Sequence, residues 1–465
     1  MMCRTKRPAR ILITIAASLA IVLIPVSAVH AQNSESASVP TIPAAIDLQD
    51  GDTLVFLGDS ITHQRLYTQY VEDFFYTRFP HRRIRFHNAG IGGARAWDAL
   101  QRVSRDVLDY KPRYVTVLLG MNDGSYQPFN TDIFNTYQSD MLELISKLRE
   151  GGAIPVLMSP TMFDARTGRL KNRWDEAMLS QYNAVLAYYG KWLQHQAIEQ
   201  GFSFVDMFGL LNKLTMEQRK VDGNFTLIRD AIHPDAPGQL VMAYAMIEDL
   251  GLRKGLSSIR VMNLPNGKLR VAGTGGKASN AVATDAGVEF DWLADGLPWV
   301  VPAEAQLGAD LTKLGHRASR EALIVPLLPA GNYELSIDGT VVGQYSQAQL
   351  AGGIELQGNS KTPQYQQAMN VAMLNKTRNE GPVRELRDAW RSFQTWARQS
   401  RELSKQPGNE QMAKQVAASR EKVDGLEAAI VAAEAASAEI EAKIYEANQP
   451  VSRHYKLTRV TPAKK

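Results

Sequence analysis

The chain has 465 residues, with 52 Lys and Arg against 48 Asp and Glu, and one cysteine, Cys3. Four of the basic residues and none of the acidic ones lie in residues 1–31, so the rest of the chain carries 48 charges of each sign. This balance argues against nucleic acid or an anionic membrane surface as a partner. Without cysteine beyond residue 3, that remainder has no disulfide, no cysteine-ligated metal and no cysteine nucleophile.

Residues 1–31 have the layout of a secretory signal peptide. Basic residues at 4–10 precede an apolar run at 11–26, and Val29-His30-Ala31 follows as the expected cleavage site. A retained membrane anchor is the alternative, but serine and proline interrupt the run, which is shorter than the ~20 apolar residues of a membrane span. We therefore expect a secreted or periplasmic protein with no stable membrane insertion after cleavage, beginning with a flexible leader at 32–46.

Residues 47–254 alternate between strand and helix patterns. Strands are expected at 53–57, 83–87, 114–119, 154–158 and 202–205, and helices at 66–79, 96–110, 133–149, 175–200 and 238–250. Such alternation is typical of a mostly parallel sheet with helices on both faces and right-handed crossovers. The sequence therefore predicts an α/β domain, a three-layer α/β/α sandwich around a five-stranded, mostly parallel sheet.

After residue 254 the pattern changes twice. Residues 255–358 contain two hairpin signals, Asn266-Gly267 and Asp338-Gly339, each between short apolar runs, and predict a small β domain. Residues 359–450 carry apolar side chains at helical and then seven-residue spacing, which predicts a helical hairpin or short coiled coil. The first face comprises Val383, Leu386, Trp390, Phe393 and Ala397, and the second Met412, Val416, Val423, Leu426, Ile430, Ala433, Ile440 and Ile444. Residues 451–465 are expected to be a basic tail.

The hairpin could act within the chain or between two copies. Ser419 and Ser437 fall at core positions of the repeat, which favours packing within the chain over a dimeric coiled coil. Self-association through these helices remains the alternative.

Four polar stretches follow predicted strands or lie in a late loop of the α/β domain. They are Gly58-Asp59-Ser60, Asn88-Ala89-Gly90-Ile91-Gly92-Gly93, Gly120-Met121-Asn122-Asp123 and Asp230-Ala231-Ile232-His233. Each alone has an ordinary interpretation as a helix cap, a turn or a surface pair. Parallel sheets gather ligands at the carboxyl ends of their strands, so the stretches are expected to meet there. Together they offer a hydroxyl, backbone amides, a side-chain amide and a carboxylate–imidazole pair, the parts of an acyl-transfer site.

In their order and contexts, these stretches resemble the SGNH or GDSL hydrolase family, over about residues 53–250. The resemblance implies a flavodoxin-like fold and a serine esterase. It makes Ser60 the nucleophile, His233 the general base and Asp230 the residue that orients His233. The oxyanion would be held by the backbone N–H groups of Ser60 and Gly93 and by the side chain of Asn122.

Asp59 and Asp123 would brace the loops of the site. The chain departs from the family pattern in two places: Ile61-Thr62 replaces the commoner Leu-Ser, and Gly92 beside Gly93 leaves the backbone donor ambiguous by one residue. The Gly-x-Ser-x-Gly elbow of the ordinary serine hydrolases does not occur in the chain.

The remaining histidines point to no other chemistry. His63, on the same helical turn as Ser60, should point away from the hydroxyl, and His87 at the end of the second strand is expected to be a buried structural residue. The sequence has no cluster typical of a metal site, and the expected mechanism needs neither metal nor cofactor.

The substrate pocket is predicted only in outline. The segment 160–174 is expected to be a long loop whose Met162 and Phe163 could form a pocket wall, together with Gly92, Tyr126 and Phe129. The expected substrate is a small-molecule or polysaccharide ester.

Export and the appended β domain with Trp292 and Trp299 favour a carbohydrate O-acetyl esterase, although both tryptophans could be core residues. A lipase, lysophospholipase or thioesterase of the same fold is an alternative. A non-catalytic carbohydrate- or envelope-binding protein is another.

Overall fold

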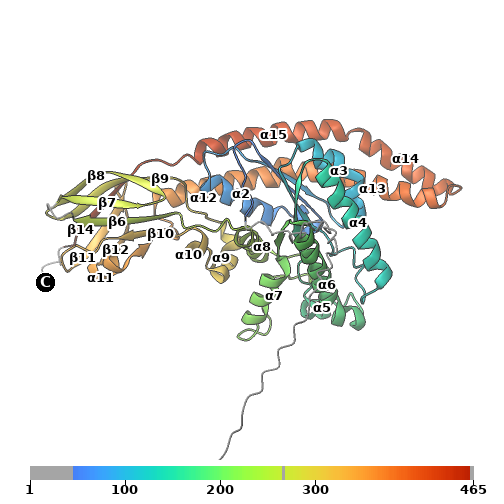
Figure 1. The fold of residues 1–465 in the computed structure, drawn as a ribbon, viewed down its shortest axis with the longest axis horizontal. Helices are drawn as coiled ribbons and strands as arrows, with labels where there is room; N and C mark the ends of the chain where they lie inside the picture. Colours follow the sequence, from blue (N-terminus) through green and yellow to red (C-terminus); the bar gives the residue numbers. More distant parts are fainter. Residues whose placement is uncertain (1–44, 264–267, 461–465) are drawn as a thin grey trace, which may run out of the picture. The chain divides into compact units, whose positions relative to one another are not determined.

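A five-stranded parallel sheet organises the first half of the protein, which is coloured from blue to green in Figure 1. The computed structural model describes residues 45–263 and 268–460. The strands are β1 (Thr53–Gly58), β2 (Arg85–Gly90), β3 (Tyr114–Leu118), β4 (Ile154–Met158) and β5 (Ser203–Val205). They pair in the order β2-β1-β3-β4-β5, all parallel. Every residue of β1 is buried, as expected for a strand covered on both faces, and the predicted fold class is confirmed.

Helices connect these strands. They are α1 (Ser60–His63), α2 (Leu66–Arg78), α3 (Ala96–Asp106), α4 (Thr131–Glu150), α5 (Ala165–Lys171), α6 (Glu176–Gln200), α7 (Met207–Gln218) and α8 (Ala236–Asp249). The five predicted helices are present with ends that shift by a few residues. Two helices were missed. Asp164 caps α5 by accepting a hydrogen bond from Thr167 N, so segment 160–174 is not one long loop, and Asp206 caps α7 in the same way.

The β region contains two sheets with short helices between strands. Its elements are β6 (Ser257–Asn263), β7 (Leu269–Thr274), β8 (Gly276–Thr284), β9 (Gly287–Ala294), α9 (Gln306–Thr312), α10 (Leu314–Ala318), β10 (Glu321–Ile324), β11 (Asn332–Ile337), β12 (Thr340–Ser346), α11 (Gln347–Gly352) and β13 (Ile354–Glu355). Asp338 and Gly339, with φ of 50° and 77°, form the predicted β11–β12 turn. Strands β6 and β7 pair antiparallel, but the predicted turn residues Asn266 and Gly267 lie outside the described residues.

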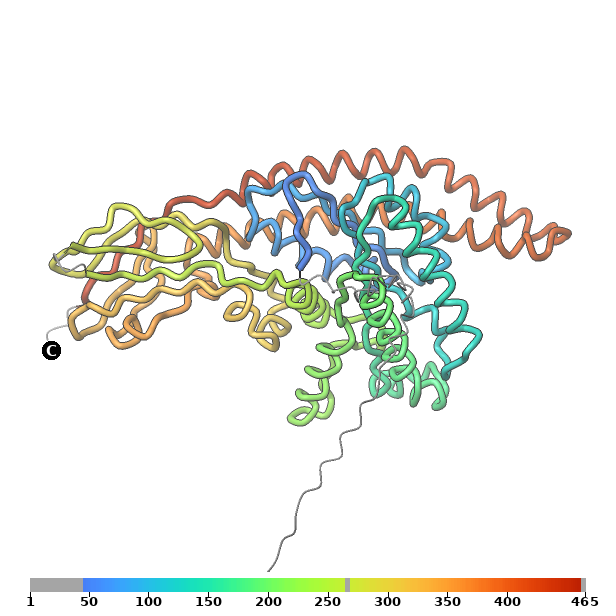
Figure 2. Tube along the Cα trace, viewed as in Figure 1, coloured from blue at the N-terminus to red at the C-terminus, as the bar shows by residue number. Residues whose placement is uncertain are grey.

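The last described segment is a strand rather than a tail. Strand β14 (Arg453–Arg459) lies between β9 and β11 and pairs antiparallel with both. In Figure 2 the chain leaves the last helix and re-enters the β region. Tyr455 and Leu457, each 1% exposed, complete the core of this region, while Lys456 between them is exposed. The prediction of a basic tail from residue 451 is therefore wrong for β14, because its charged residues alternate with buried ones.

The C-terminal helices form an antiparallel arrangement. They are α12 (Pro363–Arg378), α13 (Arg384–Lys405), α14 (Glu410–Asp424) and α15 (Leu426–Ala447). A kinked segment at Asn379–Val383, in which Gly381 has non-helical backbone angles, joins α12 to α13, and the chain returns along them through α14 and α15 (Figure 2). Leu386 and Trp390, on the predicted apolar face of α13, are buried.

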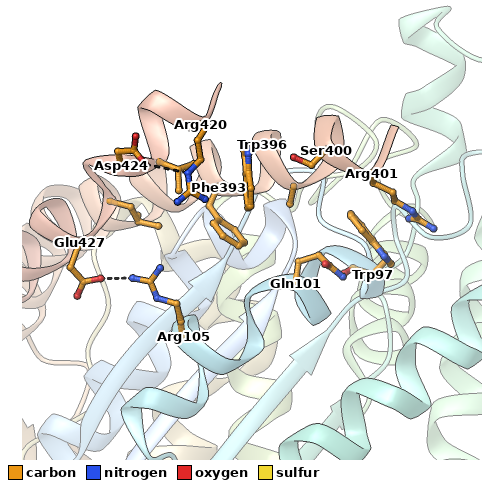
Figure 3. Close-up of a pocket in the computed structure, with 13 residues that line it drawn as sticks. Trp97, Gln101, Arg105, Phe393, Trp396, Ser400, Arg401, Arg420, Asp424 and Glu427 are labelled. Atoms are coloured by element: carbon orange, nitrogen blue, oxygen red, sulfur yellow. Dashed lines mark hydrogen bonds and ion pairs between the residues drawn. The ribbon is translucent and has the colours of Figure 1, made fainter. Parts of the chain in front are cut away.

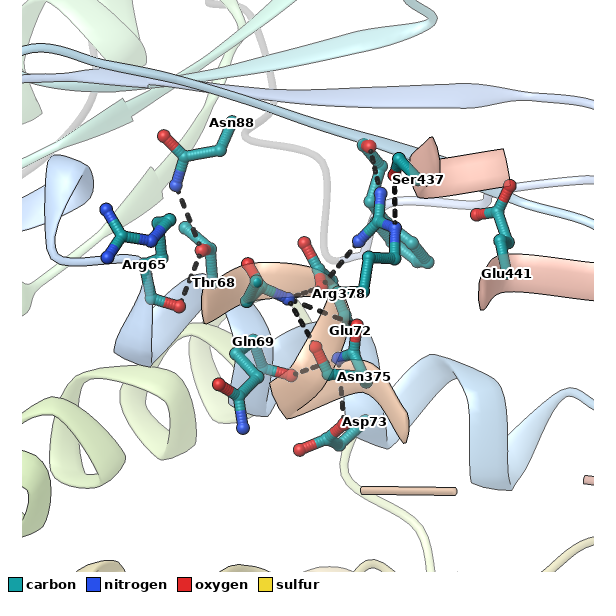
Figure 4. A network of polar contacts seen from close by, with 12 residues as sticks. Arg65, Thr68, Gln69, Glu72, Asp73, Asn88, Asn375, Arg378, Ser437 and Glu441 are labelled. Atoms are coloured by element: carbon teal, nitrogen blue, oxygen red, sulfur yellow. Dashed lines mark hydrogen bonds and ion pairs between the residues drawn. The ribbon is translucent and has the colours of Figure 1, made fainter. Parts of the chain in front are cut away.

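A buried polar network fastens these helices to α2 (Figure 4). Arg378 Nη1 donates to Glu72 Oε2 at 3.1 Å, and Asn375 Nδ2 donates to Asp73 Oδ1 at 2.8 Å. Arg378 Nε also donates to the hydroxyl of Ser437, at 2.8 Å. Ser437 is therefore a polar partner within the chain, which explains a serine at a core position of the repeat. Self-association remains a prediction.

The described residues contain two hydrophobic cores. One joins the α/β domain to Trp299 and to Trp390 of α13, and the other lies within the β region and includes Trp292. Trp292 and Trp299 are only 1% and 2% exposed, so neither offers a surface to a sugar. None of the described helices is both long and apolar enough to cross a membrane. The expected signal peptide, residues 1–31, and residues 32–44 of the expected leader lie outside the described residues. Ile46, at the end of that leader, is 2% exposed and belongs to the main core, so the prediction of a flexible segment is wrong there.

Candidate active site

Ser60 lies at the carboxyl edge of the sheet because the chain turns sharply after β1. Asp59 caps the short helix α1, with its Oδ1 accepting a hydrogen bond from Ile61 N at 2.9 Å. A Cβ at Gly58 would lie 2.1 Å from Thr62 Oγ1, so only glycine allows α1 to approach the end of β1 this closely. The result is a rigid turn that leaves the Ser60 hydroxyl partly exposed.

Ser60, His233 and Asp230 form a continuous chain of hydrogen bonds. His233 Nε2 lies 2.7 Å from Ser60 Oγ, and His233 Nδ1 lies 2.7 Å from Asp230 Oδ2. With the Nδ1 proton donated to the carboxylate, Nε2 is free to accept the hydroxyl proton of Ser60. Residues 173 positions apart in sequence thus meet in a geometry suited to general-base activation of a serine.

The loop that carries Asp230 and His233 is held by its own hydrogen bonds. Asp230 Oδ1 accepts hydrogen bonds from the backbone N–H groups of Ile232, at 2.9 Å, and His233, at 2.7 Å. Partial burial alone would raise the pKa of Asp230, but the hydrogen bonds from the His233 ring and from these two N–H groups lower it well below its ordinary value. Asp230 is therefore ionised at neutral pH, as an acceptor for the His233 ring must be.

Asp164 supports this loop from outside and was not singled out in the sequence. Its backbone N donates to Ala231 O at 2.9 Å, and Ala231 takes a left-handed conformation with φ of 79°, uncommon for a residue with a Cβ. Arg219 and Thr226 each donate to Asp164 Oδ2 at 2.6 Å. The N-cap pattern before α5 was the only local signal for Asp164.

Asn122 contacts Asp59 of the first stretch and Ala94, the residue directly after the glycine stretch. Its Nδ2 donates to Ala94 O at 3.1 Å and lies 3.5 Å from Asp59 Oδ2, while its Oδ1 accepts from Tyr126 OH at 3.1 Å. The strands that precede these loops are in register, with Gly58 opposite both Gly90 and Leu118. The Ser60 turn, the glycine loop and the Asn122 turn therefore meet at one edge of the sheet.

The backbone at Gly92 and Gly93 forms an open turn after β2. Gly93 has φ of 70°, and a Cβ at either glycine would have no neighbour within 4 Å. Gly90 differs, because a Cβ there would lie 2.4 Å from His63 N. The glycine loop is therefore tightly packed where it leaves the strand and open where the predicted donor lies.

Asp59 and Asp123 are buried carboxylates that contact the loops they were predicted to brace. Asp123 Oδ1 accepts from Ala96 N at 2.9 Å, at the start of α3. Burial raises the pKa of Asp59 to about 6 and that of Asp123 to about 7. Both groups therefore titrate close to neutral pH.

Some of the predicted pocket residues are buried in the core, and others are exposed or lie at the site. Met162 and Phe163 are 3% and 1% exposed and belong to the core, so the prediction that they line a pocket does not hold. The ring of Tyr126 stacks on Tyr182 at 5.1 Å and its hydroxyl contacts Asn122, which places Tyr126 at the site. Phe129 is 46% exposed, and Gly92 is partly exposed.

His63 and His87 have partners other than Ser60. His63 Nε2 lies 3.6 Å from Asp388 Oδ1, and burial, with Arg65 nearby, lowers the pKa of His63 to about 4. His87 is buried, with its Nε2 3.0 Å from Asp106 O and its ring stacked on Tyr110. Among the described residues, no group of three or more His, Cys, Asp or Glu side chains is placed to hold a metal ion.

The α/β domain that carries this site is similar to known proteins. Residues 56–241 match the GDSL-like lipase/acylhydrolase family. An acetylxylan esterase of Geobacillus stearothermophilus is 24% identical over 222 residues, which are 43% of this chain and 94% of that esterase. An uncharacterized lipoprotein of Bacillus subtilis (strain 168) is 34% identical over 74 residues, 16% of this chain and 30% of the lipoprotein.

One solved structure resembles more than the α/β domain. It is that of a gut microbial diltiazem-metabolizing enzyme, with a TM-score of 0.74 and 25% identity. The match covers 90% of this chain and 99% of that enzyme. The β region and the C-terminal helices thus occur together with the α/β domain in another enzyme.

Proposed function

Because residues 56–241 belong to the GDSL-like lipase/acylhydrolase, or SGNH, family and the protein is an ester-hydrolysing enzyme, we propose that Ser60, His233 and Asp230 are its catalytic triad. The observation that carries the proposal is the unbroken chain of two 2.7 Å hydrogen bonds from Ser60 Oγ through the His233 ring to Asp230. A serine hydroxyl is a weak nucleophile until an adjacent base accepts its proton.

In the first half of the reaction, Ser60 Oγ attacks the ester carbonyl carbon as His233 Nε2 takes the hydroxyl proton. The protonated ring then gives this proton to the leaving alcohol oxygen, and an acyl-enzyme remains. Asp230 stabilises the charged ring between these two transfers. In the second half, His233 deprotonates a water that attacks the acyl carbonyl, and release of the acid restores the Ser60 hydroxyl.

The negative charge on the carbonyl oxygen is held by the backbone N–H groups of Ser60 and Gly93 and by Asn122 Nδ2. An amide nitrogen carries two hydrogens, and only one of those on Asn122 is needed for its 3.1 Å bond to Ala94 O. The 3.5 Å contact with Asp59 is long for a hydrogen bond, so the second hydrogen is available to the oxyanion.

The favoured substrate class is an O-acetylated carbohydrate, and the enzyme is proposed to act after export. The acetylxylan esterase relative, aligned over 94% of its length, supports this class. The buried Trp292 and Trp299 lend no support, contrary to the expectation from the sequence. Lipid esters and thioesters remain alternatives within the same chemistry, whereas the non-catalytic alternative conflicts with the family and its esterase relative.

Two assays test the proposal. The wild-type enzyme should hydrolyse p-nitrophenyl acetate, and Ser60→Ala should abolish this activity; equal rates for the two proteins would refute the triad. Acetate release from acetylated xylan should then exceed fatty-acid release from a long-chain p-nitrophenyl ester. The opposite ranking would favour the lipase alternative.

A further inference from the structure

Helix α13 contacts the loops of the active site although it lies about 300 residues further along the chain. Three of its side chains reach them: Asp388 lies near His63, Gln394 bonds Gly92, and Arg398 bonds Gly93. Neither the family match, which ends at residue 241, nor the triad accounts for these contacts.

Gln394 holds the peptide unit that contains the predicted oxyanion donor. Its Nε2 donates to Gly92 O at 3.0 Å, and its side chain is only 5% exposed. The carbonyl of Gly92 and the N–H of Gly93 belong to the same planar peptide unit, and in a trans peptide they point in opposite directions. Fixing the Gly92 oxygen toward α13 therefore fixes the Gly93 N–H on the side facing away from α13.

Arg398 holds the next peptide unit. Its Nη2 donates to Gly93 O at 2.6 Å, and its guanidinium binds both carboxylate oxygens of Asp98, at 2.7 and 2.6 Å. Asp98 in turn accepts a hydrogen bond from Arg95 N at 2.8 Å, at the start of α3. The peptide units on both sides of Gly93 are thus tied to α13.

These bonds matter because packing alone leaves the loop open. Adjacent glycines have the greatest backbone freedom, and the positions of the missing side chains at Gly92 and Gly93 border open space. Oxyanion donors are effective when their orientation is fixed before the reaction. A donated hydrogen bond to the Gly92 carbonyl also polarises the peptide unit and strengthens its N–H as a donor.

Helix α13 is itself rigidly anchored. Arg387 is fully buried and binds both oxygens of Asp106, at 2.9 Å each, and Arg102 binds the same carboxylate at 2.5 Å. Trp390, one turn before Gln394, is fully buried in the main core. The helix can therefore serve as a fixed support.

We propose that Gln394 and Arg398 are positioning residues for the oxyanion hole, so that the C-terminal helices are part of the catalytic apparatus. The inference rests on the proposed function. It assigns these residues an effect on transition-state binding rather than on substrate affinity.

The test uses the full-length chain with Gln394→Met, which keeps the side-chain size but removes the donor, and Arg398→Ala. Each variant should have a kcat for p-nitrophenyl acetate about tenfold below that of the wild type. This loss is smaller than that expected when an oxyanion donor is removed altogether. KM should stay within about threefold, the pattern of an interaction made in the transition state. Arg398→Lys, which can still donate to Gly93 O, should recover part of the loss.

Arg401→Ala is the matched control. Arg401 is exposed, one turn beyond Arg398, and covers the ring of Trp97 at 4.2 Å in a groove of about 810 Å³ between α3 and the hairpin (Figure 3). The Arg401→Ala substitution removes the same charge from the same helix, but Arg401 does not bond the glycine loop. The kcat of this variant should therefore match that of the wild type.

Wild-type kcat in both Gln394→Met and Arg398→Ala would overturn the inference, as would a loss that follows only the unfolded fraction measured by thermal melting. If Gln394→Met fails to fold, the half-exposed Arg398 and its Lys variant decide the question. Failure of the proposed function looks different, because wild-type hydrolysis would then not depend on Ser60.

Discussion

The turn at Ser60 and the loop at Gly92 and Gly93 are neighbours at one sheet edge, but they are held in different ways. The turn at Ser60 is fixed locally, by the Asp59 cap and by close packing around Gly58, where there is no space for a side chain. The loop at Gly92 and Gly93 borders open space and is bonded to a helix 302 residues further along the chain. Ser60 is thus positioned by residues next to it in the sequence. The Gly92–Gly93 loop, which carries a predicted oxyanion donor, is held by a helix from a distant part of the chain.

The largest effect should come from the triad. His233→Ala and Asp230→Asn should each lower kcat for p-nitrophenyl acetate by about 10³-fold or more, because the base is lost or held in the wrong tautomer. Thermal melting should show both variants folded, since the two side chains lie on a partly exposed loop. Near-wild-type turnover in His233→Ala would mean that another group activates Ser60.

The next largest effect should come from the oxyanion side. Asn122→Ala removes one proposed oxyanion donor. Such a donor is worth about 3 kcal/mol, so the variant should lower kcat about a hundredfold or more. The fall should appear in kcat with little change in KM. An increase in KM alone would instead assign Asn122 to ground-state binding.

A pair of glycine substitutions tests the packing difference directly. Gly90→Ala places a Cβ 2.4 Å from His63 N and should destabilise the fold by about 3 kcal/mol, measured by urea unfolding. Gly92→Ala meets no atom within 4 Å and should change stability by less than about 0.5 kcal/mol. Similar losses of unfolding free energy in the two variants would contradict the difference in packing between Gly90 and Gly92.

The smallest effect concerns Asp123. Burial raises its pKa to about 7, so the folded protein retains a proton that the unfolded chain releases at lower pH. This contribution to stability is present in acid and is lost as pH rises toward about 7. Asp123→Asn, which keeps an acceptor for Ala96 N, should melt a few degrees above the wild type at pH 8 and show a flatter pH dependence. Parallel melting curves from pH 4 to 8 would contradict the raised pKa.

The sequence predicts the elements whose signals are local. The apolar run of β1 and the strand–helix alternation gave the parallel sheet, and four short motifs gave the residues that meet around Ser60. Strand β14 was missed because only Tyr455 and Leu457 mark its buried face, in a short segment next to the basic end of the chain.

Other features carried no such signal. Gln394 and Arg398 lie on a helix with an ordinary amphipathic pattern, and nothing near them in sequence shows which backbone they will contact. Their partners are set by the docking of α13, which depends on buried pairs such as Arg387 and Asp106 that join distant segments. The helix caps at Asp164 and Asp206 were readable, yet short helices with few periodic positions are easily taken for loops.

The most direct test of the account is to identify the nucleophile by covalent trapping. A fluorophosphonate ester phosphonylates an activated serine with loss of fluoride, and the tetrahedral adduct resembles the oxyanion intermediate. It should add one group per chain, and peptide mass spectrometry should locate that group on Ser60. Labelling should be lost in Ser60→Ala and strongly slowed in His233→Ala. Modification of a different residue, or full hydrolytic activity after Ser60 is blocked, would contradict the assignment of Ser60 as the nucleophile.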